Sequence, residues 1–256
     1  MAVDPNRELL VCPDPEAVAR EGARRFVLHA AAAIQQRGRF AVALSGGSTP
    51  KRMYEVLAQE HRDQVDWDLV HFFWGDERFV PSTNAASNYH MTEVALLNAL
   101  ELQNGNIHRV RTELEGAEAA AAAYEREIIS FFSLAGELPR FDLILLGLGT
   151  NGHTASLFPY SKSLHENSRL VVAEYIDEVK QSRITLTAPI INAARDIVFL
   201  ATGAEKASVV KEILFGPIDT ERLPAQLIRP ASSTATWLLD RTAASQLPKD
   251  SYRIVS

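Results

Sequence analysis

Short apolar runs alternate along the chain with stretches whose apolar residues recur at helical spacing. Runs in which almost every residue is apolar predict strands that are buried on both faces of a sheet. The clearest of these predicted strands cover Glu8–Val11, Phe40–Leu44, Leu69–Trp74, Leu143–Leu146, Asp196–Ala201 and Thr234–Leu239. Strands that alternate with helices in this way indicate an α/β fold with a single doubly wound, mostly parallel sheet.

The intervening segments predict helices with recognisable start and stop signals. Asp14 precedes the first helical pattern, Ser87 and Asn88 precede a later one, and Gly38 is a typical stop. An alanine-rich helix is predicted over Glu115–Phe132. Weaker patterns predict short strands or helices over Ile107–Val110, Leu170–Tyr175, Arg183–Leu186, Pro189–Ala194 and Ala225–Ile228. We find no internal repeat and no linker, so we expect one domain over residues 1–256.

The turn Ser45–Pro50, with the sequence SGGSTP, joins a buried strand to the next predicted helix. Thr49 is placed to cap that helix, and Pro50 suits its first position. The turn offers backbone N–H groups and hydroxyls through Ser45, Gly46, Gly47, Ser48 and Thr49. Such donors at a helix N-terminus are typical of a phosphate site, although a tight strand-to-helix turn would have the same sequence. The spacing is neither that of a Walker loop nor that of a nucleophile elbow.

Acidic and basic residues follow the predicted strand Leu69–Trp74. Asp76, Glu77 and Arg78 come at its carboxyl end, which is where open α/β sheets bind their ligands. The alternative interpretation is a solvated turn with local ion pairs. Both interpretations stay open at this point.

A glycine-rich turn lies within Phe141–Pro159, directly after another buried run. Gly147, Gly149 and Gly152 spell G-x-G-x-x-G, and Glu174 follows about 20 residues later, as in dinucleotide-binding folds. The sequence therefore raises the hypothesis of a nicotinamide oxidoreductase.

Two features of this turn count against a nicotinamide cofactor. Pro159 interrupts the helix that should begin at the third glycine, only seven residues earlier. The residue that should pack closely against the sheet is His153, whose side chain is polar. A histidine has an unperturbed pKa near neutrality, so His153 at the end of a buried strand is instead a candidate acid or base.

Composition and charge restrict the classes of protein to which this chain can belong. An apolar content of 46% over 256 residues is enough for a full core, whereas the net charge of −6 argues against a nucleic-acid surface. Cys12 is the only cysteine, which excludes an intrachain disulfide and CxxC motifs. The N-terminus does not have the pattern of a signal peptide, and no apolar run reaches about 20 residues. We therefore expect a cytoplasmic protein without membrane partners.

Several motifs together resemble those of the 6-phosphogluconolactonases, which share a superfamily with glucosamine-6-phosphate deaminases. In the order typical of that family they are SGGSTP (Ser45–Pro50), WGDERFVP (Trp74–Pro81), SNY (Ser87–Tyr89), GLGTNGHTASLFP (Gly147–Pro159), RITLT (Arg183–Thr187) and GAEKA (Gly203–Ala207). The resemblance implies a modified Rossmann-like fold and metal-independent hydrolysis of 6-phosphoglucono-δ-lactone in the oxidative pentose phosphate pathway. It also implies a small sugar phosphate lactone as partner and no cofactor. We expect a monomer or small homo-oligomer.

The same resemblance implies roles for individual residues. The Ser45–Thr49 turn, Arg183 and Lys206 would bind the 6-phosphate. Arg78 would contact the substrate near its reacting end, and His153 would be the catalytic base. A δ-lactone is an activated ester, so a base that takes a proton from water and returns one to the ring oxygen is sufficient. Backbone N–H groups of the glycine turn or the Arg78 guanidinium could stabilise the oxyanion.

One residue departs from the family pattern. Members often carry aspartate where this chain has Asn151. Asn151 can orient the imidazole of His153 through a hydrogen bond, but it supplies no charge. Asp76 and Glu77 are carboxylates that could take over the charged role.

Three alternatives to this chemistry stay open. Ser45 or Ser48 could act as a nucleophile, although neither has an elbow context. Deaminases that resemble this chain carry glutamate five positions after the histidine, whereas this chain has Phe158 at that position. They also carry an aromatic residue where this chain has Arg78. A sugar-phosphate sensor would keep the phosphate turn without turnover, but the intact His153 favours an enzyme.

Overall fold

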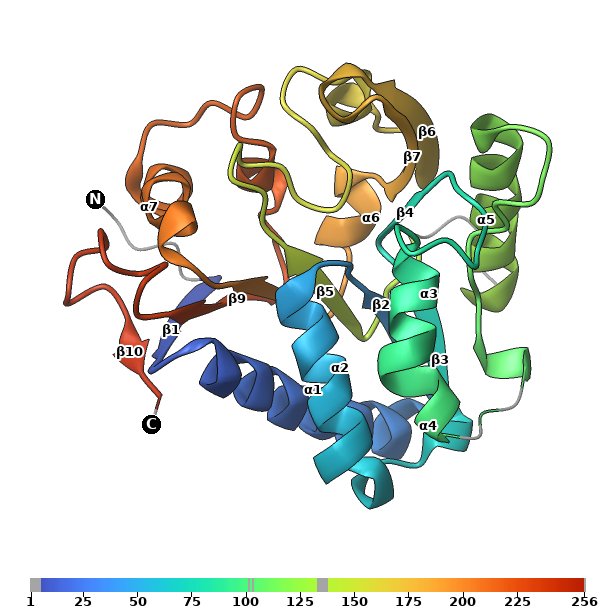
Figure 1. Cartoon of the computed structure of the whole chain (residues 1–256), viewed down its shortest axis with the longest axis horizontal. Coiled ribbons are helices and arrows are strands. Elements are labelled where there is room, and N and C mark those ends of the chain that lie inside the picture. Colours follow the sequence, from blue (N-terminus) through green and yellow to red (C-terminus); the bar gives the residue numbers. More distant parts are fainter. Residues whose placement is uncertain (1–5, 101, 103, 133–137, 256) are drawn as a thin grey trace.

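A parallel sheet forms the centre of the computed structural model, which describes residues 6–100, 102, 104–132 and 138–255 (Figure 1). Its seven strands are β1 (Arg7–Cys12), β2 (Phe40–Leu44), β3 (Val70–Trp74), β5 (Leu143–Gly147), β8 (Asp196–Ala201), β9 (Thr234–Asp240) and β10 (Arg253–Ile254). They lie in the order β10-β1-β9-β8-β5-β2-β3, and neighbouring strands are parallel. The predicted doubly wound, parallel sheet is confirmed, and β10 is a strand that was not predicted.

Helices cover both faces of this sheet (Figure 1). They are α1 (Pro15–Arg37), α2 (Ser48–Glu60), α3 (Asn88–Thr92), α4 (Asn98–Leu100), α5 (Ala117–Phe132), α6 (Ala188–Asn192) and α7 (Ala207–Phe215), with a π-helical turn over Glu93–Leu97. Among the helices of the described residues, none combines the length and apolar character needed to cross a bilayer.

The core has two layers because successive strand residues point to opposite faces of the sheet. In β5, Ile144 and Leu146 join a layer that also contains side chains of α5, α6 and α7. Leu143 and Leu145 join the other layer, which contains side chains of α1 and α2. Burial on both faces explains why these strands are apolar throughout.

The ligand-binding crevice expected of such a fold lies between β2 and β5. From β2 the chain passes to β3 on one side, whereas from β5 it passes to β8 on the other side. The segments that follow these two adjacent strands therefore diverge, and open α/β sheets bind ligands at such a point. The Ser45–Pro50 turn follows β2 and the glycine turn follows β5, so the two predicted site segments meet here.

A second sheet of three antiparallel strands was not predicted. It contains β4 (Asp76–Arg78), β7 (Gln181–Leu186) and β6 (Val171–Ile176), in that order. The strands predicted near β6 and β7 are confirmed as strands, but they belong to this sheet and not to the central one. Their polar residues suit an antiparallel sheet, because such a sheet can leave one face solvated. The register places Arg78 opposite Arg183.

The predicted helix caps and the weaker predicted strands can be compared with the structure. Asp14 caps α1 and Ser87 caps α3 through side-chain oxygens that accept backbone N–H groups. The segment Ile107–Val110, in contrast, does not form the strand that was predicted there. Within the described residues it forms a single parallel bridge, between Ile107 and Phe72, so the predicted strand was wrong.

The start of α2 also differs from the prediction. The helix begins at Ser48, and its N-cap is Gly47, so Thr49 is not the cap. The Oγ1 atom of Thr49 instead lies 2.8 Å from Oγ1 of Thr202, which follows β8. This hydrogen bond joins the turn after β2 to the turn after β8.

Candidate active site

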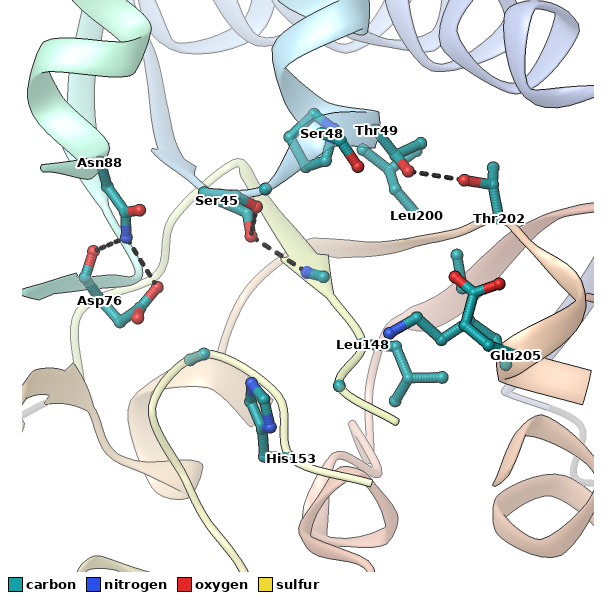
Figure 2. Close-up of a pocket in the computed structure, with 18 of the residues that line it drawn as sticks. Ser45, Ser48, Thr49, Asp76, Asn88, Leu148, His153, Leu200, Thr202 and Glu205 are labelled. Atoms are coloured by element: carbon teal, nitrogen blue, oxygen red, sulfur yellow. Dashed lines mark hydrogen bonds between the residues drawn. The ribbon is translucent and has the colours of Figure 1, made fainter. Parts of the chain in front are cut away.

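A cavity of about 310 Å³ lies at the carboxyl ends of β2, β5 and β8 (Figure 2). Figure 2 shows Ser45 and His153 on facing sides of it, with Asp76 towards one end and Glu205 towards the other. Of the predicted site residues, the wall includes Ser45, Gly46, Gly47, Ser48, Thr49, Arg78, His153 and Lys206. Within the described chain, Asn151 and Arg183 are not part of the wall, and each contacts or pairs with a residue that is.

Several wall residues were not predicted as site residues, among them Asp76, Asn88 and Thr202. Asp76 was predicted only as a possible support for His153, Asn88 only as a residue at the start of a helix, and Thr202 had no predicted role. The sequence contains signals for all three, since Asp76 and Asn88 lie inside the WGDERFVP and SNY motifs. Thr202 directly precedes the GAEKA motif.

A buried hydroxyl holds the turn after β2 in place. Tyr54 Oη donates to the Ser45 carbonyl at 2.9 Å and accepts the Ser45 N–H at 3.0 Å. Ser45 Oγ accepts the N–H of Gly147 at 3.0 Å and donates to the Gly46 carbonyl at 3.2 Å, which ties the two site turns together. A serine nucleophile needs a base that accepts its hydroxyl hydrogen. The hydroxyl of Ser45 instead donates its hydrogen bond to a backbone carbonyl, and this geometry argues against Ser45 as a nucleophile.

The N-terminus of α2 is open towards the cavity. Gly47 has a φ of +104°, a conformation that favours glycine, and no side chain of the described residues caps the helix. Ser48, Thr49 and Pro50, which form the first turn, line the cavity. The first N–H groups of a helix have no partner within it, and together with the helix dipole they favour an anion.

Three cationic side chains lie at or beside the cavity. Burial lowers the pKa of Lys206, which lines the wall, while the nearby Glu205 raises it. Burial lowers the pKa of Arg183, and repulsion from Arg78 lowers it further. The Nε atoms of both arginines are buried without a hydrogen-bond partner in the described part of the chain. Desolvated cations with open donors favour a bound anion.

His153 is partly buried against the ring of Phe158. The two rings stack with their centroids 4.2 Å apart and their planes 16° apart. Burial lowers the pKa of His153 to about 4; Asp76 opposes this shift, and the three cations add to it. The imidazole is therefore neutral at neutral pH, which is the form that can accept a proton.

Asn151 determines which nitrogen of His153 carries the hydrogen. Its Oδ1 lies 2.6 Å from His153 Nδ1 and also accepts the backbone N–H of His153 at 3.2 Å. Its Nδ2 donates to both carboxylate oxygens of Glu178, each at 3.0 Å. Since the amide nitrogen faces a carboxylate, the amide oxygen faces His153, and Nδ1 must be the donor. Nε2 then keeps its lone pair, as a general base requires.

The two carboxylates considered as partners of His153 have different surroundings. Glu77 is 2% exposed, and burial raises its pKa. It accepts hydrogen bonds from the backbone N–H groups of Arg78, Asn88 and Tyr89 and from the hydroxyl of Ser87. These four bonds fill its acceptor sites, so Glu77 holds the start of α3 and is not available to His153.

Asp76, in contrast, lines the cavity. It accepts the Ser156 hydroxyl at 2.5 Å and Nδ2 of Asn88 at 3.3 Å, and its negative charge favours the protonated form of His153. Within the described residues, no group of three or more His, Cys, Asp or Glu side chains is arranged to hold a metal ion.

Known proteins are similar to this chain over most of its length. The profile of a family described as glucosamine-6-phosphate isomerases/6-phosphogluconolactonase matches residues 13–237. A 6-phosphogluconolactonase from Synechocystis sp. is 44% identical over 216 residues, which cover 84% of this chain and 88% of that protein. One from Nostoc sp. is 38% identical over 238 residues, with 93% and 97% covered. The solved 6-phosphogluconolactonase structure from Trypanosoma cruzi has a TM-score of 0.85 at 31% identity and covers 96% of this chain and 98% of its own.

Proposed function

We propose that this chain, which belongs to the family of glucosamine-6-phosphate isomerases and 6-phosphogluconolactonases, is a 6-phosphogluconolactonase. It would hydrolyse 6-phospho-D-glucono-1,5-lactone to 6-phospho-D-gluconate in the oxidative pentose phosphate pathway. The observation that carries the proposal is the neutral His153, oriented by Asn151 in a cavity that also offers an open helix N-terminus and Lys206. The resemblance found in the motifs is confirmed at the level of the family.

In the proposed mechanism His153 is a general base. Its Nε2 takes a proton from a water molecule as that water attacks the lactone carbonyl carbon, and the same nitrogen returns a proton to the ring oxygen as the ester opens. Arg78 lines the cavity with an unpartnered Nε among the described residues, so it is suited to stabilise the oxyanion. Asp76 would counter the positive charge that His153 acquires during the step.

The phosphate end of the substrate would lie at the start of α2. The first N–H groups of this helix and the hydroxyls of Ser48 and Thr49 provide donors, and Lys206 and Arg183 provide charge. The cavity volume of about 310 Å³ is at the lower end of the range for ligand pockets, about 300–1,000 Å³, which suits a single sugar phosphate.

An assay of the purified protein tests the reaction. We expect 6-phosphogluconolactone to open faster than its spontaneous rate, with the same acceleration in the presence of a chelator. No acceleration would contradict the proposal, and 6-phosphogluconate binding without turnover would instead indicate a sensor. Release of ammonia from glucosamine 6-phosphate would favour the deaminase alternative. The packing of Phe158 against His153, at the position where deaminases carry glutamate, argues against that outcome.

Replacing Lys206 with alanine is expected to weaken substrate binding more than turnover. A charged hydrogen bond to a phosphate contributes about 1.5–3 kcal/mol, so KM should rise about 10- to 150-fold while kcat changes little. Steady-state kinetics would show the split. Lys211→Ala removes an exposed lysine from α7 and is the matched control, with no expected change in KM. A fall in kcat at unchanged KM would place Lys206 at the reacting end.

The pH dependence of kcat should follow His153. The neutral imidazole is the active form, and its pKa is lowered from the ordinary 6.5 to about 4. Activity should therefore persist as the pH falls through 6.5 and should be lost only as it approaches 4. The measurement is kcat between pH 4 and 8, with circular dichroism at each pH to exclude unfolding. An acid limb centred near 6.5 would mean that His153 is more solvated than the structure indicates.

A further inference from the structure

We propose that Glu178 is the positioning carboxylate of the active site and acts on His153 through the side-chain amide of Asn151. The inference rests on the proposed function for its catalytic consequence. Its structural part, the orientation and tautomer of His153, can be tested without turnover.

Both carboxylate oxygens of Glu178 accept a hydrogen bond from the side-chain amide of Asn151. Nδ2 of Asn151 lies 3.0 Å from Oε1 and 3.0 Å from Oε2 of Glu178. On its other side, Oδ1 of Asn151 lies 2.6 Å from His153 Nδ1. The carboxylate, the amide and the imidazole therefore form one chain of hydrogen bonds. Without Glu178, only the longer hydrogen bond from the backbone N–H of His153, at 3.2 Å, would keep the amide oxygen of Asn151 towards the imidazole in the described chain.

The pairing also explains why asparagine is tolerated at position 151. An aspartate there would bring a second carboxylate against Glu178, and two adjacent carboxylates cannot both remain ionised without repulsion. Asn151 avoids this conflict, because its NH2 group donates to the carboxylate that is already present. The carboxylate therefore does not contact the imidazole directly. It belongs to Glu178 and is separated from His153 by the side chain of Asn151.

The charges around His153 give Glu178 a second effect. Arg78 on β4, Arg183 on β7 and Lys206 before α7 all disfavour the protonated imidazole, and Asp76 on β4 favours it. Glu77 is saturated by other donors. A carboxylate at the end of the Asn151 chain adds to the effect of Asp76 and stabilises the imidazolium as the water proton is transferred.

Glu178 is carried to this place by the connection between β6 and β7. It lies in the 3-10 turn Asp177–Val179, which ends at Lys180 with a φ of +49°. The Lys180 N–H donates to the Asp177 carbonyl at 3.3 Å and closes the turn. The same hairpin carries Arg183 on β7, so one segment presents both a predicted phosphate ligand and the carboxylate behind the base.

The test compares Glu178→Ala with Glu178→Gln. We expect Glu178→Ala to lower kcat about tenfold with KM within about twofold. This is far less than the roughly 10⁴-fold loss when a buried carboxylate in direct contact with a catalytic histidine is neutralised, because Glu178 is exposed and acts through an amide. Glu178→Gln keeps an acceptor for Asn151 Nδ2 and should recover most of the loss. Asp177→Ala removes a neighbouring exposed carboxylate from the same turn and should leave kcat unchanged.

Nuclear magnetic resonance of ¹⁵N-labelled histidine supplies the readout that does not depend on turnover. His153, assigned by comparison with His153→Ala, should be protonated at Nδ1 in the wild type and in Glu178→Gln. It should show a mixture of tautomers in Glu178→Ala. The pH midpoint of His153 should be lower in both variants, because both remove a negative charge. If the wild type has no lactonase activity but these spectra change as expected, the proposed function fails and the positioning role stands.

A double variant tests the coupling directly. Asn151→Asp alone should lose activity because its carboxylate meets that of Glu178, and Asn151→Asp combined with Glu178→Gln should recover it. The proposal is overturned if Glu178→Ala has wild-type kcat and an unchanged tautomer, if Asp177→Ala has an equal effect, or if the losses of Asn151→Asp and Glu178→Gln simply add.

Discussion

Replacing His153 with alanine is expected to lower kcat for lactone hydrolysis by about 10²–10⁴-fold while 6-phosphogluconate still binds. This range is the usual contribution of a positioned general base. Binding should survive because the open start of α2 and Lys206, which form the proposed phosphate site, are supplied by other segments. Stopped-flow assay of lactone opening and calorimetric titration with 6-phosphogluconate would measure the two effects separately.

The control for this variant is another histidine. His165→Ala removes a side chain that is 68% exposed and paired with Glu221, so kcat should be unchanged. Because alanine also uncovers the ring of Phe158, thermal unfolding of His153→Ala should be compared with that of the wild type. Full activity in a folded His153→Ala protein would show that another group is the base.

Replacing Gly149 with alanine is expected to disable His153 without removing it. A Cβ atom at position 149 would lie 2.1 Å from Nδ1 and 2.2 Å from Cε1 of His153, and 2.8 Å from Oδ1 of Asn151. The imidazole must therefore leave its place, and a displacement of about 1 Å at a reacting group can cost about 10²-fold in rate. The backbone at this position is not in the left-handed region, so alanine itself is not strained there.

Gly105→Ala is the matched control for this substitution. A Cβ atom at Gly105 would meet nothing within 4 Å, so both activity and stability should be unchanged. We expect Gly149→Ala to keep a cooperative unfolding transition and to lose kcat, with the ¹⁵N signals of His153 shifted. Wild-type kcat in Gly149→Ala would mean that the imidazole can move without losing its alignment, and the assignment of a fixed base would have to be abandoned.

Buried strands and most helix caps could be predicted from the sequence because their signals are local. Phe40–Leu44 is apolar at every position because both faces of β2 are covered. Asp14 has the short acceptor side chain that a helix N-terminus needs. The error at Thr49 is local as well. Gly47 is the N-cap, because its positive φ allows α2 to begin at Ser48.

Contacts between distant segments could not be predicted from local patterns. The pairing of Arg78 with Arg183 depends on the register of β4 against β7, which is set by how the two segments pack. The contact of Glu178 with Asn151 depends on a turn of the β6–β7 hairpin and has no motif of its own. The cavity residues were identified mainly because the family motifs carry spatial information. The single domain, the cytoplasmic location and the oligomeric state stay predictions.

The place of β1 in the sheet has a consequence for how the protein is made. β1 lies between β9 and β10, and Glu8 and Thr236 meet across the sheet although 228 positions separate them. In the described chain β1 has no other strand partner. At a synthesis rate of about 5–20 residues per second, β1 waits roughly 10–45 s on the ribosome before β9 has been made. The apolar part of β1, Leu9–Cys12, has unpaired edges during that time, and such a segment is prone to aggregate. The yield of this protein is therefore expected to depend on chaperones that cover β1 until β9 has been made.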